Sequence, residues 1–560
     1  MAKKGSEIIV DTLNRHGVKF VFGIPGAKVD QLFETLEHPE NGQKVPQLIV
    51  TRHEQNAAFM AQGIARLTGN AGVVITTSGP GVGNLATGLM TASAEGDAVV
   101  AIGGQVPRKD LYRLTHQSIP SKELMKPVTR YSVEIEDPNT ISEILNNAFA
   151  QAYGPKAGAA FVSLPQDIDE AQVEIPALPQ VDRAQMGPAI ESDLVDLADQ
   201  IKAAKLPVLL VGMRASDSKT VEALHSLLKV LPLPVVETFQ GAGVVSRELE
   251  DQSFFGRIGL FHNQIGDQIL QDSDLVITVG YDPIEYEPRF WNPKADLNII
   301  DLDTTKAQFD NNFVPKKQLI GELAASLNRL EAHLSGSSLK EESQAILADY
   351  REKLKAADEP SFTPNDDCLS HPLSIVEETQ KHVDDDMTVS LDIGSHYIWM
   401  ARHFRSYKPR HLLISNGMQT LGVGLPWAMA AALVRPEHKS VAVVGDGGFF
   451  FSAAELETAV RLNLDITVIV WNDNSKYNMV EFQEELKYNN QSAGVQFGPI
   501  DVVKFADSCG AAGFRVESSD QLGEVFDQAF AHKGVSVIDV PVDYSHNTEL
   551  ASQIIGNDLN

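Results

Sequence analysis

Two acidic loops in the last third of the chain have residue types and a spacing that could do chemistry. The apolar run Val441–Val444 ends in Gly445-Asp446-Gly447-Gly448, and the apolar run Ile466–Trp471 ends in Asn472-Asp473-Asn474. The intervening residues carry a helical pattern, so the two runs predict neighbouring parallel strands joined by one crossover. Both carboxylates are then expected at the same edge of one sheet, where open α/β sheets bind ligands.

Carboxylate and amide oxygens beside a glycine turn suit a hard cation. Mg²⁺ usually takes one or two carboxylates and lets phosphate oxygens complete its octahedron. The backbone amides of the turn at Gly445–Phe449, at a helix start, could help to hold a diphosphate. An isolated Gly-Asp-Gly is more often a strand end with solvated acids, but the second acidic loop favours a cation site.

A third candidate is Glu54, in the segment Arg52-His53-Glu54-Gln55-Asn56, at a predicted junction between a strand and an alanine-rich helix. One interpretation is an acid placed at a helix start because the helix dipole favours it there. The other is a carboxyl group that faces an apolar site.

The elements that must position these residues form three α/β segments. Short apolar strands alternate with helical patterns throughout, and each strand ends in a loop with glycine, proline or polar residues. Besides the two runs above, the predicted strands are Val18–Phe22, Leu48–Val50, Gly72–Thr76, Val99–Ile102, Ala160–Leu164, Pro207–Val211, Pro234–Glu237, Leu275–Val279, Leu297–Ile300, Val389–Leu391, His411–Ser415 and Val535–Val540. We predict an α/β fold of three doubly wound parallel-sheet domains, at 1–180, 190–340 and 370–560, with a polar linker at 341–369. The first residues fit an amphipathic helix with Ile9 and Leu13 on its apolar side.

Composition narrows the class of protein. The 560 residues carry a net charge of −29, which argues against nucleic acid and anionic membranes as partners. Hydrophobic residues make up 43% of the chain, enough for substantial cores. Only two cysteines are present, and no signal-peptide or transmembrane pattern is seen, so a cytoplasmic location is expected.

Six motifs occur in an order that resembles the thiamin-diphosphate (ThDP)-dependent 2-keto-acid enzymes, over almost the entire chain. They are FGIPGAKVD, RHEQNAAFMA, TSGPGVGN, FVSLPQD, GDGGF and DNSKYNM. In that family a glutamate in the RHE-type motif hydrogen-bonds N1′ of the cofactor's pyrimidine, which implies this role for Glu54. A carboxyl shielded from water keeps its proton more readily. Sharing that proton would help the neighbouring amine to remove the C2 proton of the thiazolium, and the cofactor then serves as an electron sink.

Within the family the chain is most similar to the acetolactate synthases of the catabolic, acetoin-pathway type. The segments that carry this likeness include GIPGAKVDQLFETL, HQSIPSKELMKPVTRY, VGYDPIEYEPRFWN and YNMVEFQEELKY. The resemblance implies condensation of two pyruvates to 2-acetolactate with loss of CO2, by way of a carbanion on the cofactor.

The resemblance also implies a set of site residues. The catalytic set is Glu54, Lys28 and Gln117, and the substrate pocket holds Met479, Val480 and Gln483. The implied Mg²⁺ ligands are Asp446 and Asp473, with Ser475 and Lys476 in the loop that completes the shell. The implied ThDP-binding residues are Pro25, Gly26, Glu54, Pro80, Asn84, Ile393, Gly394, Ser395, His396, Gln419, Leu421, Gly445, Asp446, Gly447, Gly448, Asp473, Tyr477, Asn478 and Met479. Two positions depart from the family pattern: Asp473 stands where asparagine is usual, and Leu421 where methionine is frequent.

Partners follow from the same resemblance. We expect pyruvate as substrate, ThDP and Mg²⁺ as cofactors, and a homodimer or homotetramer whose active site is shared between subunits, without a regulatory subunit. We expect no FAD, because Arg257, Leu260 and Phe261 stand in a loop that contributes to the flavin site in biosynthetic relatives.

Several alternatives stay open on the sequence. A pyruvate oxidase, a simple decarboxylase or another carboligase would share the motifs. A nicotinamide oxidoreductase is suggested by the run ADLNIIDLD, but the glycines at 79, 81 and 83 do not form the GxGxxG pattern that such a protein needs. A non-catalytic protein that kept the fold is disfavoured by the intact Glu54, Asp446 and Asp473.

Overall fold

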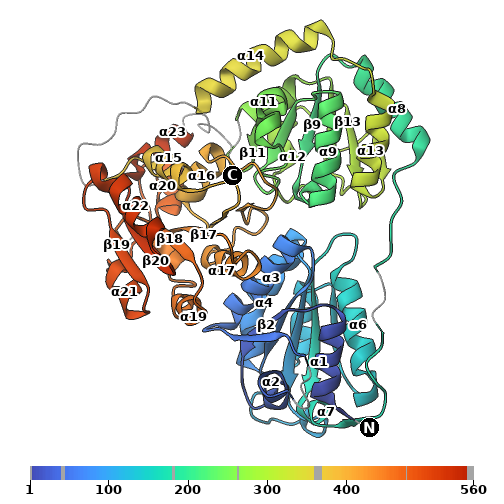
Figure 1. Ribbon diagram of the computed structural model, residues 1–560, viewed down its shortest axis with the longest axis vertical. Helices are drawn as coiled ribbons and strands as arrows, with labels where there is room; N and C mark the ends of the chain where they lie inside the picture. Colours follow the sequence, from blue (N-terminus) through green and yellow to red (C-terminus); the bar gives the residue numbers. More distant parts are fainter. Residues whose placement is uncertain are drawn as a thin grey trace. The chain divides into compact units, whose positions relative to one another are not determined.

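The computed structural model describes residues 3–39, 44–179, 183–261, 264–358, 369–474 and 476–551 (Figure 1). These residues form three six-stranded sheets in which every pairing is parallel, with helices between the strands. The α/β fold class with three parallel sheets is therefore confirmed. The domain boundaries near 180, 190, 340 and 370 stay a prediction.

The first and third sheets share one strand order. The first runs β3-β2-β4-β5-β7-β6 and the third β16-β15-β17-β18-β20-β19, so that each reads 2-1-3-4-6-5 when its strands are numbered along the chain. The strands of the first sheet are β2 (Phe20–Ile24), β3 (Gln47–Val50), β4 (Gly72–Thr76), β5 (Val99–Gln105), β6 (Tyr131–Glu134) and β7 (Ala159–Pro165). Those of the third are β15 (Thr388–Leu391), β16 (Leu412–Leu413), β17 (Ser440–Gly445), β18 (Ile466–Asn472), β19 (Ala512–Arg515) and β20 (Val535–Pro541).

The middle sheet has a different order, β11-β10-β9-β12-β13-β14, which reads 3-2-1-4-5-6. Its strands are β9 (Pro207–Val211), β10 (Val235–Thr238), β11 (Phe254–Ile258), β12 (Leu275–Val279), β13 (Ile299–Asp303) and β14 (Lys317–Ile320). In each of the three sheets the chain leaves the first strand in one direction and later returns to its other side. The carboxyl ends of the two strands at that switch point are where doubly wound sheets bind ligands.

Helices join and cover the strands. Before and within the first sheet they are α1 (Gly5–Arg15), α2 (Asp30–Glu37), α3 (Glu54–Thr68), α4 (Pro80–Glu95), α5 (Ser121–Met125), α6 (Ile141–Ala152) and α7 (Gln166–Asp169). Around the middle sheet they are α8 (Glu191–Ala203), α9 (Ser218–Val230), α10 (Glu250–Ser253), α11 (Ile265–Asp272), α12 (Pro288–Trp291), α13 (Leu323–Leu334) and the following α14 (Glu341–Asp358). The third segment has α15 (Pro372–His382), α16 (Ser395–His403), α17 (Gly424–Val434), α18 (Asp446–Phe449), α19 (Glu455–Arg461), α20 (Asn478–Lys487), α21 (Val502–Ser508), α22 (Leu522–Ala531) and α23 (Asn547–Ala551).

The described residues group into two compact units. One combines the first sheet with 425–437 and 452–464, which contain most of α17 and all of α19, and the other holds the middle sheet and the rest of the third segment. Within the first unit α17 packs against α3, because a Cβ at Gly63 would lie 2.7 Å from the Cβ of Ala430. The guanidinium of Arg66 lies 4.4 Å from the ring centre of Trp427 and pairs with Glu95 and Asp97.

Most predicted strands appear within two residues of their expected bounds, and the expected first helix is α1. Four strands of the six-stranded sheets were missed: β6, β11, β14 and β19, each of which lies at the edge of its sheet. The short antiparallel pair of β1 (Lys3–Lys4) and β8 (Gln172–Val173) was missed as well. No helix in the described ranges is both long and apolar enough to cross a membrane.

Candidate active site

Glu54 is the first residue of α3 and is held by a neighbouring amide. His53 caps the helix, and its Nδ1 accepts a hydrogen bond from the Gln55 N–H at 3.1 Å. The Glu54 side chain is buried, with 8% of the residue exposed, and Asn84 Nδ2 donates to its Oε2 at 2.9 Å. The structure therefore joins two of the predicted cofactor residues, from the loop after β3 and from α4.

The glycines near Glu54 leave room that a side chain would take. A Cβ at Gly81 would lie 2.5 Å from Thr76 Oγ1 and 3.4 Å from Glu54 Oε1. A Cβ at Gly26 would lie 2.6 Å from that of Thr77. The hydroxyl oxygens of Thr76 and Thr77 are buried and have no hydrogen-bond partner within the described part of the chain. Buried polar atoms are normally paired, so these two mark a place where an incoming ligand or water would bind.

Glu455, at the start of α19, fixes the turn that precedes Glu54. Its carboxylate accepts the backbone N–H groups of Arg52 and His53 and the side-chain amide of Asn56, at 3.0 to 3.1 Å. The Thr458 hydroxyl donates to the same carboxylate at 2.7 Å. Burial raises the pKa of Glu455, and these donors oppose that effect. Four donors on one buried carboxylate make the start of α3 a rigid support for Glu54.

Lys28 and Gln117 lie at other loops of the first sheet. Lys28 Nζ donates to Gln166 Oε1 at 3.1 Å, just beyond β7. Gln117 has a left-handed backbone with φ of 61° and lies against Gly79, whose added Cβ would be 3.0 Å from that of Gln117. No described hydrogen bond joins either residue to Glu54, so their catalytic roles stay predictions. Pro25, in the loop after β2, and Pro80, the first residue of α4, are exposed.

Asp446 and Asp473 lie at the carboxyl ends of adjacent strands. β17 and β18 pair in parallel, and Gly445 is opposite Trp471 in the register. Asp446 Oδ1 accepts the Gly447 N–H at 2.9 Å, and Asp473 Oδ1 accepts the Lys476 N–H at 3.0 Å. The second oxygen, Asp473 Oδ2, is buried without a hydrogen-bond partner in the described residues. The expectation that both carboxylates share one sheet edge is therefore met.

The two carboxylates destabilise one another's charge. Burial raises the pKa of Asp473 above its usual range, the nearby Asp446 carboxylate raises it further, and the Lys476 N–H opposes both effects. Tyr544 lies near the same pair: burial, followed by the charges of Asp473 and Asp446, holds the pKa of its phenol well above the usual value. A divalent cation would relieve this repulsion and use the unpaired oxygen, so the donor set fits Mg²⁺.

The glycine turn after β17 provides close approach. A Cβ at Gly447 would lie 2.7 Å from the Tyr477 ring, and one at Gly448 would lie 2.8 Å from Asp392 Oδ1. Lys476 uses its Nζ to bind Glu481 at 2.9 Å, so its side chain is directed to a carboxylate on α20. Ser475, the other predicted member of the metal loop, lies outside the described residues.

Asp392, at the end of β15, ties two predicted cofactor loops together. Its carboxylate accepts backbone N–H groups of Ile393, Gly422 and Gly424 at 2.7 to 3.1 Å. Burial raises the pKa of Asp392 to about 6, against the lowering effect of these bonds. The segment from Gln419, whose φ is 49°, to Leu421 is thereby held beside the Gly394 turn, and Leu421 Cδ2 lies 3.5 Å from where a Cβ at Gly448 would be.

His396, on the first turn of α16, is buried and neutral. Burial lowers the pKa of its imidazole to about 3, and a hydrogen bond to the Asp392 backbone acts in the opposite direction. Its Nε2 is buried without a hydrogen-bond partner among the described residues. Gly394, which precedes α16, has a φ of 151°, and glycine adopts this value more readily than other residues.

The predicted pyruvate-pocket residues occupy the first two turns of α20. Met479 is partly buried against the core of the third sheet, whereas Val480 is 45% exposed and Gln483 is half-buried. Ordinary packing within the chain therefore accounts for Met479 and leaves Val480 without a role in the core. Sequence reasoning missed four residues that support the site: Glu455, Asp392, Tyr544, and Asn547, whose Nδ2 donates to Ser395 and Asn478. Asp392 carried a signal, since it directly follows a strand and stands two residues before Gly394.

Comparisons with known proteins agree with this geometry. Three family models, the N-terminal TPP binding, central and C-terminal TPP binding domains of thiamine pyrophosphate enzymes, match residues 3–124, 194–330 and 392–540. Acetolactate synthase of Bacillus subtilis is 52% identical over 550 residues, covering 98% of this chain and 95% of the relative. The chain belongs to the thiamine pyrophosphate enzymes.

The predicted likeness to acetolactate synthases within this family is also confirmed. The catabolic acetolactate synthase of Raoultella terrigena is 43% identical over 551 residues, with 98% of this chain and 97% of the relative covered. The acetolactate synthase large subunit of Haemophilus influenzae is 29% identical over 572 residues, with 99% and 97% covered. Thiamine pyrophosphate is ThDP, so the family supports a ThDP site at these loops.

Proposed function

We propose that this enzyme is an acetolactate synthase that joins two pyruvates with ThDP and Mg²⁺. In the balanced reaction, two pyruvate anions and one proton give one 2-acetolactate anion and one CO2. The observation that carries the proposal is the 52% identity to a named acetolactate synthase over nearly the whole of both chains. Of the acids that the family chemistry needs, Asp446 and Asp473 directly follow β17 and β18, and Glu54 begins the helix that follows β3.

ThDP, when bound, supplies the electron sink for decarboxylation of the first pyruvate. Glu54 would hold a proton against the cofactor's pyrimidine, with Asn84 fixing the carboxylate at its Oε2 and Glu455 fixing the backbone before it. Asp446 and Asp473 would hold Mg²⁺ against the diphosphate, and the amides of the Gly447-Gly448 turn would approach its oxygens.

Product analysis tests the reaction. Purified protein is incubated with pyruvate, ThDP and Mg²⁺, and CO2, acetolactate, acetaldehyde and peroxide are measured. One CO2 for every two pyruvates, with acetolactate as product, is expected. Acetaldehyde would indicate a simple decarboxylase instead, and peroxide a pyruvate oxidase.

We also propose that the enzyme works without FAD. At the switch point of the middle sheet, a Cβ at Gly212 would lie 2.7 Å from Glu285 Oε1, and Met213 N and the Thr238 hydroxyl donate to the Glu285 carboxylate. Arg214 binds Asp282 at 2.7 Å and also pairs with Asp303. Carboxylates therefore stand where a dinucleotide's pyrophosphate would need donors.

The loop expected to exclude flavin supports the same proposal. Arg257 Nε binds Glu237 at 3.0 Å, and its Nη1 donates to the backbone carbonyl of Phe404 at 2.6 Å. A Cβ at Gly259 would lie 2.1 Å from the Phe239 ring, so the protein's own side chains pack closely against this loop.

Purified protein should be colourless, and added FAD should leave the rate of acetolactate formation unchanged. A yellow chromophore whose removal abolishes activity would overturn this proposal.

From the family resemblance we propose a homodimer or homotetramer in which Glu54 of one subunit serves the Asp446 loop of another. Co-expression of Glu54→Gln and Asp446→Ala chains tests it, because a mixed dimer would contain one intact site. Activity recovered in the mixed preparation supports an active site shared between subunits, and absence of activity would place both residues in one subunit.

No regulatory subunit is proposed: the Haemophilus relative is named a large subunit, whereas the more similar Bacillus and Raoultella relatives are not. A cytoplasmic location, expected from the two cysteines, is proposed as well.

A further inference from the structure

A short C-terminal segment, Tyr544 to Leu550, reaches two predicted cofactor residues. It follows β20 as a single 3-10 turn, Tyr544–His546, and continues into α23. Asn547, the first residue of α23, is 1% exposed. Its Nδ2 donates to Ser395 Oγ at 2.9 Å and to Asn478 Oδ1 at 2.6 Å. One side chain thus connects the first turn of α16 with the first turn of α20.

The orientation of the Asn547 amide is fixed by an indole. Trp399 Nε1 donates to Asn547 Oδ1 at 3.0 Å, and an indole nitrogen can only donate. The oxygen must therefore face Trp399, and the NH2 group must face Ser395 and Asn478. The amide has a partner on each side, so rotation about its last bond would break all three bonds.

These bonds decide how Ser395 and Asn478 can meet a ligand. Ser395 Oγ donates to Asn478 Oδ1 at 3.0 Å while it accepts from Asn547, so its only proton is already used. Asn478 uses its oxygen for both neighbours, and its NH2 group has no hydrogen-bond partner among the described residues. Because the Asn478 oxygen faces Ser395 and Asn547, its NH2 group faces away from them and can donate to a ligand.

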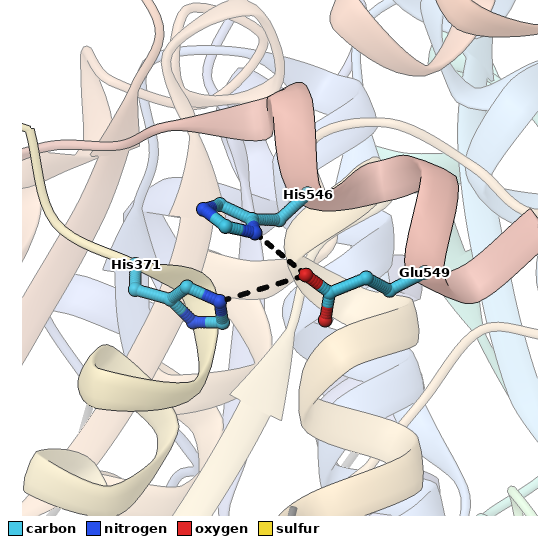
Figure 2. Close-up of side chains that lie close together, drawn as sticks. All are labelled: His371, His546 and Glu549. Carbon is cyan, nitrogen blue, oxygen red and sulfur yellow. Dashed lines mark hydrogen bonds and ion pairs between the residues drawn. The ribbon is translucent and has the colours of Figure 1, made fainter. Parts of the chain in front are cut away.

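The segment that carries Asn547 is anchored by the cluster in Figure 2. His371 and His546 direct ring nitrogens at the same oxygen of Glu549, at 3.9 and 2.6 Å, and their rings lie 3.9 Å apart. A metal site is disfavoured there, because His371 Nδ1 accepts the Leu373 N–H at 3.1 Å. That bond places the ring proton of a neutral His371 on Nε2, the atom that faces Glu549, and a protonated nitrogen cannot bind a metal. Tyr544, in the same segment, makes a further link to the backbone of His396.

We propose that Asn547 is a positioning residue for cofactor binding, which orients the Asn478 amide and the Ser395 turn toward the diphosphate of ThDP. The inference rests on the proposed function, because it takes Ser395 and Asn478 as parts of the ThDP site. Asn547 acts through these two residues. The His371–His546–Glu549 cluster ties the segment that carries Asn547 to the N-cap residue of α15.

The test measures ThDP affinity by titration calorimetry with Mg²⁺, together with thermal unfolding of the cofactor-free protein. Asn547→Ala should raise the Kd of ThDP about tenfold, the equivalent of one to two hydrogen bonds. The control is Asn292→Ala, another buried amide, which donates to the Asn312 carbonyl in the middle segment. It should lower the unfolding temperature to a similar degree and leave the Kd unchanged. An Asn547→Ala protein with a lower unfolding temperature and an unchanged Kd would overturn the proposal.

Two additions keep the result decisive. If Asn547→Ala does not fold, Asn547→Asp keeps the size and replaces the donor by an oxygen facing Asn478 Oδ1; an unchanged Kd in that variant would also overturn the proposal. In a double-mutant cycle, Asn547→Ala added to Asn478→Ala should cost less than it costs alone, whereas additive effects would contradict action through Asn478. Wild-type protein that binds ThDP but forms no acetolactate would refute the proposed function and leave this inference standing.

Discussion

The outer sheets and the middle sheet are all doubly wound, but the side chains beside their switch points differ in hydrogen bonding. Beside the outer switch points, buried polar atoms are left unpaired within the described residues: Thr76 Oγ1 at the first sheet, and Asp473 Oδ2 and His396 Nε2 at the third. At the middle switch point, Arg214 and Glu285 are bonded to neighbours of their own sheet.

Unpaired buried polar atoms are what we expect of a ligand-binding site, whereas paired side chains are what we expect of a purely structural region. Unpaired buried groups cost free energy, so they persist where a ligand supplies the missing partner. At the middle sheet the charged side chains beside the switch point pair with one another, although Gln240 Oε1 nearby is buried without a hydrogen-bond partner among the described residues. Location at a switch point is therefore a weak indicator of function, and the hydrogen bonds left open there are a stronger one.

The largest effect is expected at the first sheet. Glu54→Gln should bind ThDP with nearly wild-type affinity and turn over ~10²–10⁴-fold more slowly, because it cannot share an acidic proton. Steady-state kinetics at saturating ThDP and calorimetry measure the two quantities. Glu34→Gln, at an exposed glutamate of α2 in the same segment, serves as the control and should be unaffected. Near-normal turnover in Glu54→Gln would remove the first sheet from the chemistry.

At the third sheet the effect should fall on binding. Asp446→Ala leaves the diphosphate facing a site short of metal ligands, so the Kd of ThDP should rise about 10²- to 10³-fold, by analogy with breaking a buried ion pair. Asp501→Ala, which removes the cap of α21 in the same segment, should change stability and not the Kd. Unchanged ThDP affinity in Asp446→Ala, measured by calorimetry, would reject the metal assignment.

Asp473→Asn should have a milder effect, because the amide keeps an oxygen ligand and the family usually has asparagine there. The Kd of ThDP in the presence of Mg²⁺ should change by less than about tenfold. The variant also removes the repulsion with Asp446, so the cofactor-free protein should unfold at a higher temperature. A loss of ThDP affinity as large as that of Asp446→Ala would contradict the prediction that an amide can replace the Asp473 carboxylate.

The middle sheet should respond in stability alone. Burial raises the pKa of Glu285 to about 7, so the folded state binds a proton that the unfolded state releases above about pH 4.5. Stability of the wild type therefore falls as pH rises from 4.5 to 7, by up to about 1.4 kcal/mol per pH unit for this group.

Glutamine at position 285 cannot titrate, so the unfolding temperature of Glu285→Gln relative to that of the wild type should rise between pH 5 and 7.5. The turnover number should stay the same. The exposed Glu287→Gln, two residues away, is the matched control. If the gap between variant and wild type did not change with pH, the raised pKa of Glu285 would be wrong.

The sequence was most informative where apolar runs are continuous. Central strands such as β4, β9 and β12 were predicted at their observed bounds, because strands buried on both faces carry uninterrupted apolar residues. The missed strands β6, β11, β14 and β19 lie at sheet edges. There one side lacks a neighbouring strand, and segments such as Lys317–Ile320 are partly exposed and more polar, so the apolar pattern is weak.

The site loops that directly follow strands could be predicted from the sequence. The residues that hold these loops in place by hydrogen bonds could not. The sequence placed Asp446 and Asp473 at one edge, since the strand–helix–strand spacing determines that arrangement. Glu455, Asn547 and Tyr544 hold the site from segments distant in the chain, and no local pattern distinguishes them from ordinary helix or turn residues. Ser475 and the stretch 359–368 fall outside the described residues.

Exchange of the ThDP C2 proton, followed by NMR on protein-bound cofactor, tests most directly whether the first sheet activates the cofactor that the third sheet binds. Wild type, Glu54→Gln and Asp446→Ala are compared at saturating ThDP and Mg²⁺. We predict exchange ~10²–10⁴-fold slower in Glu54→Gln and close to wild type in Asp446→Ala once the cofactor is bound. Wild-type exchange in Glu54→Gln, or equal slowing in both variants, would contradict this division of roles.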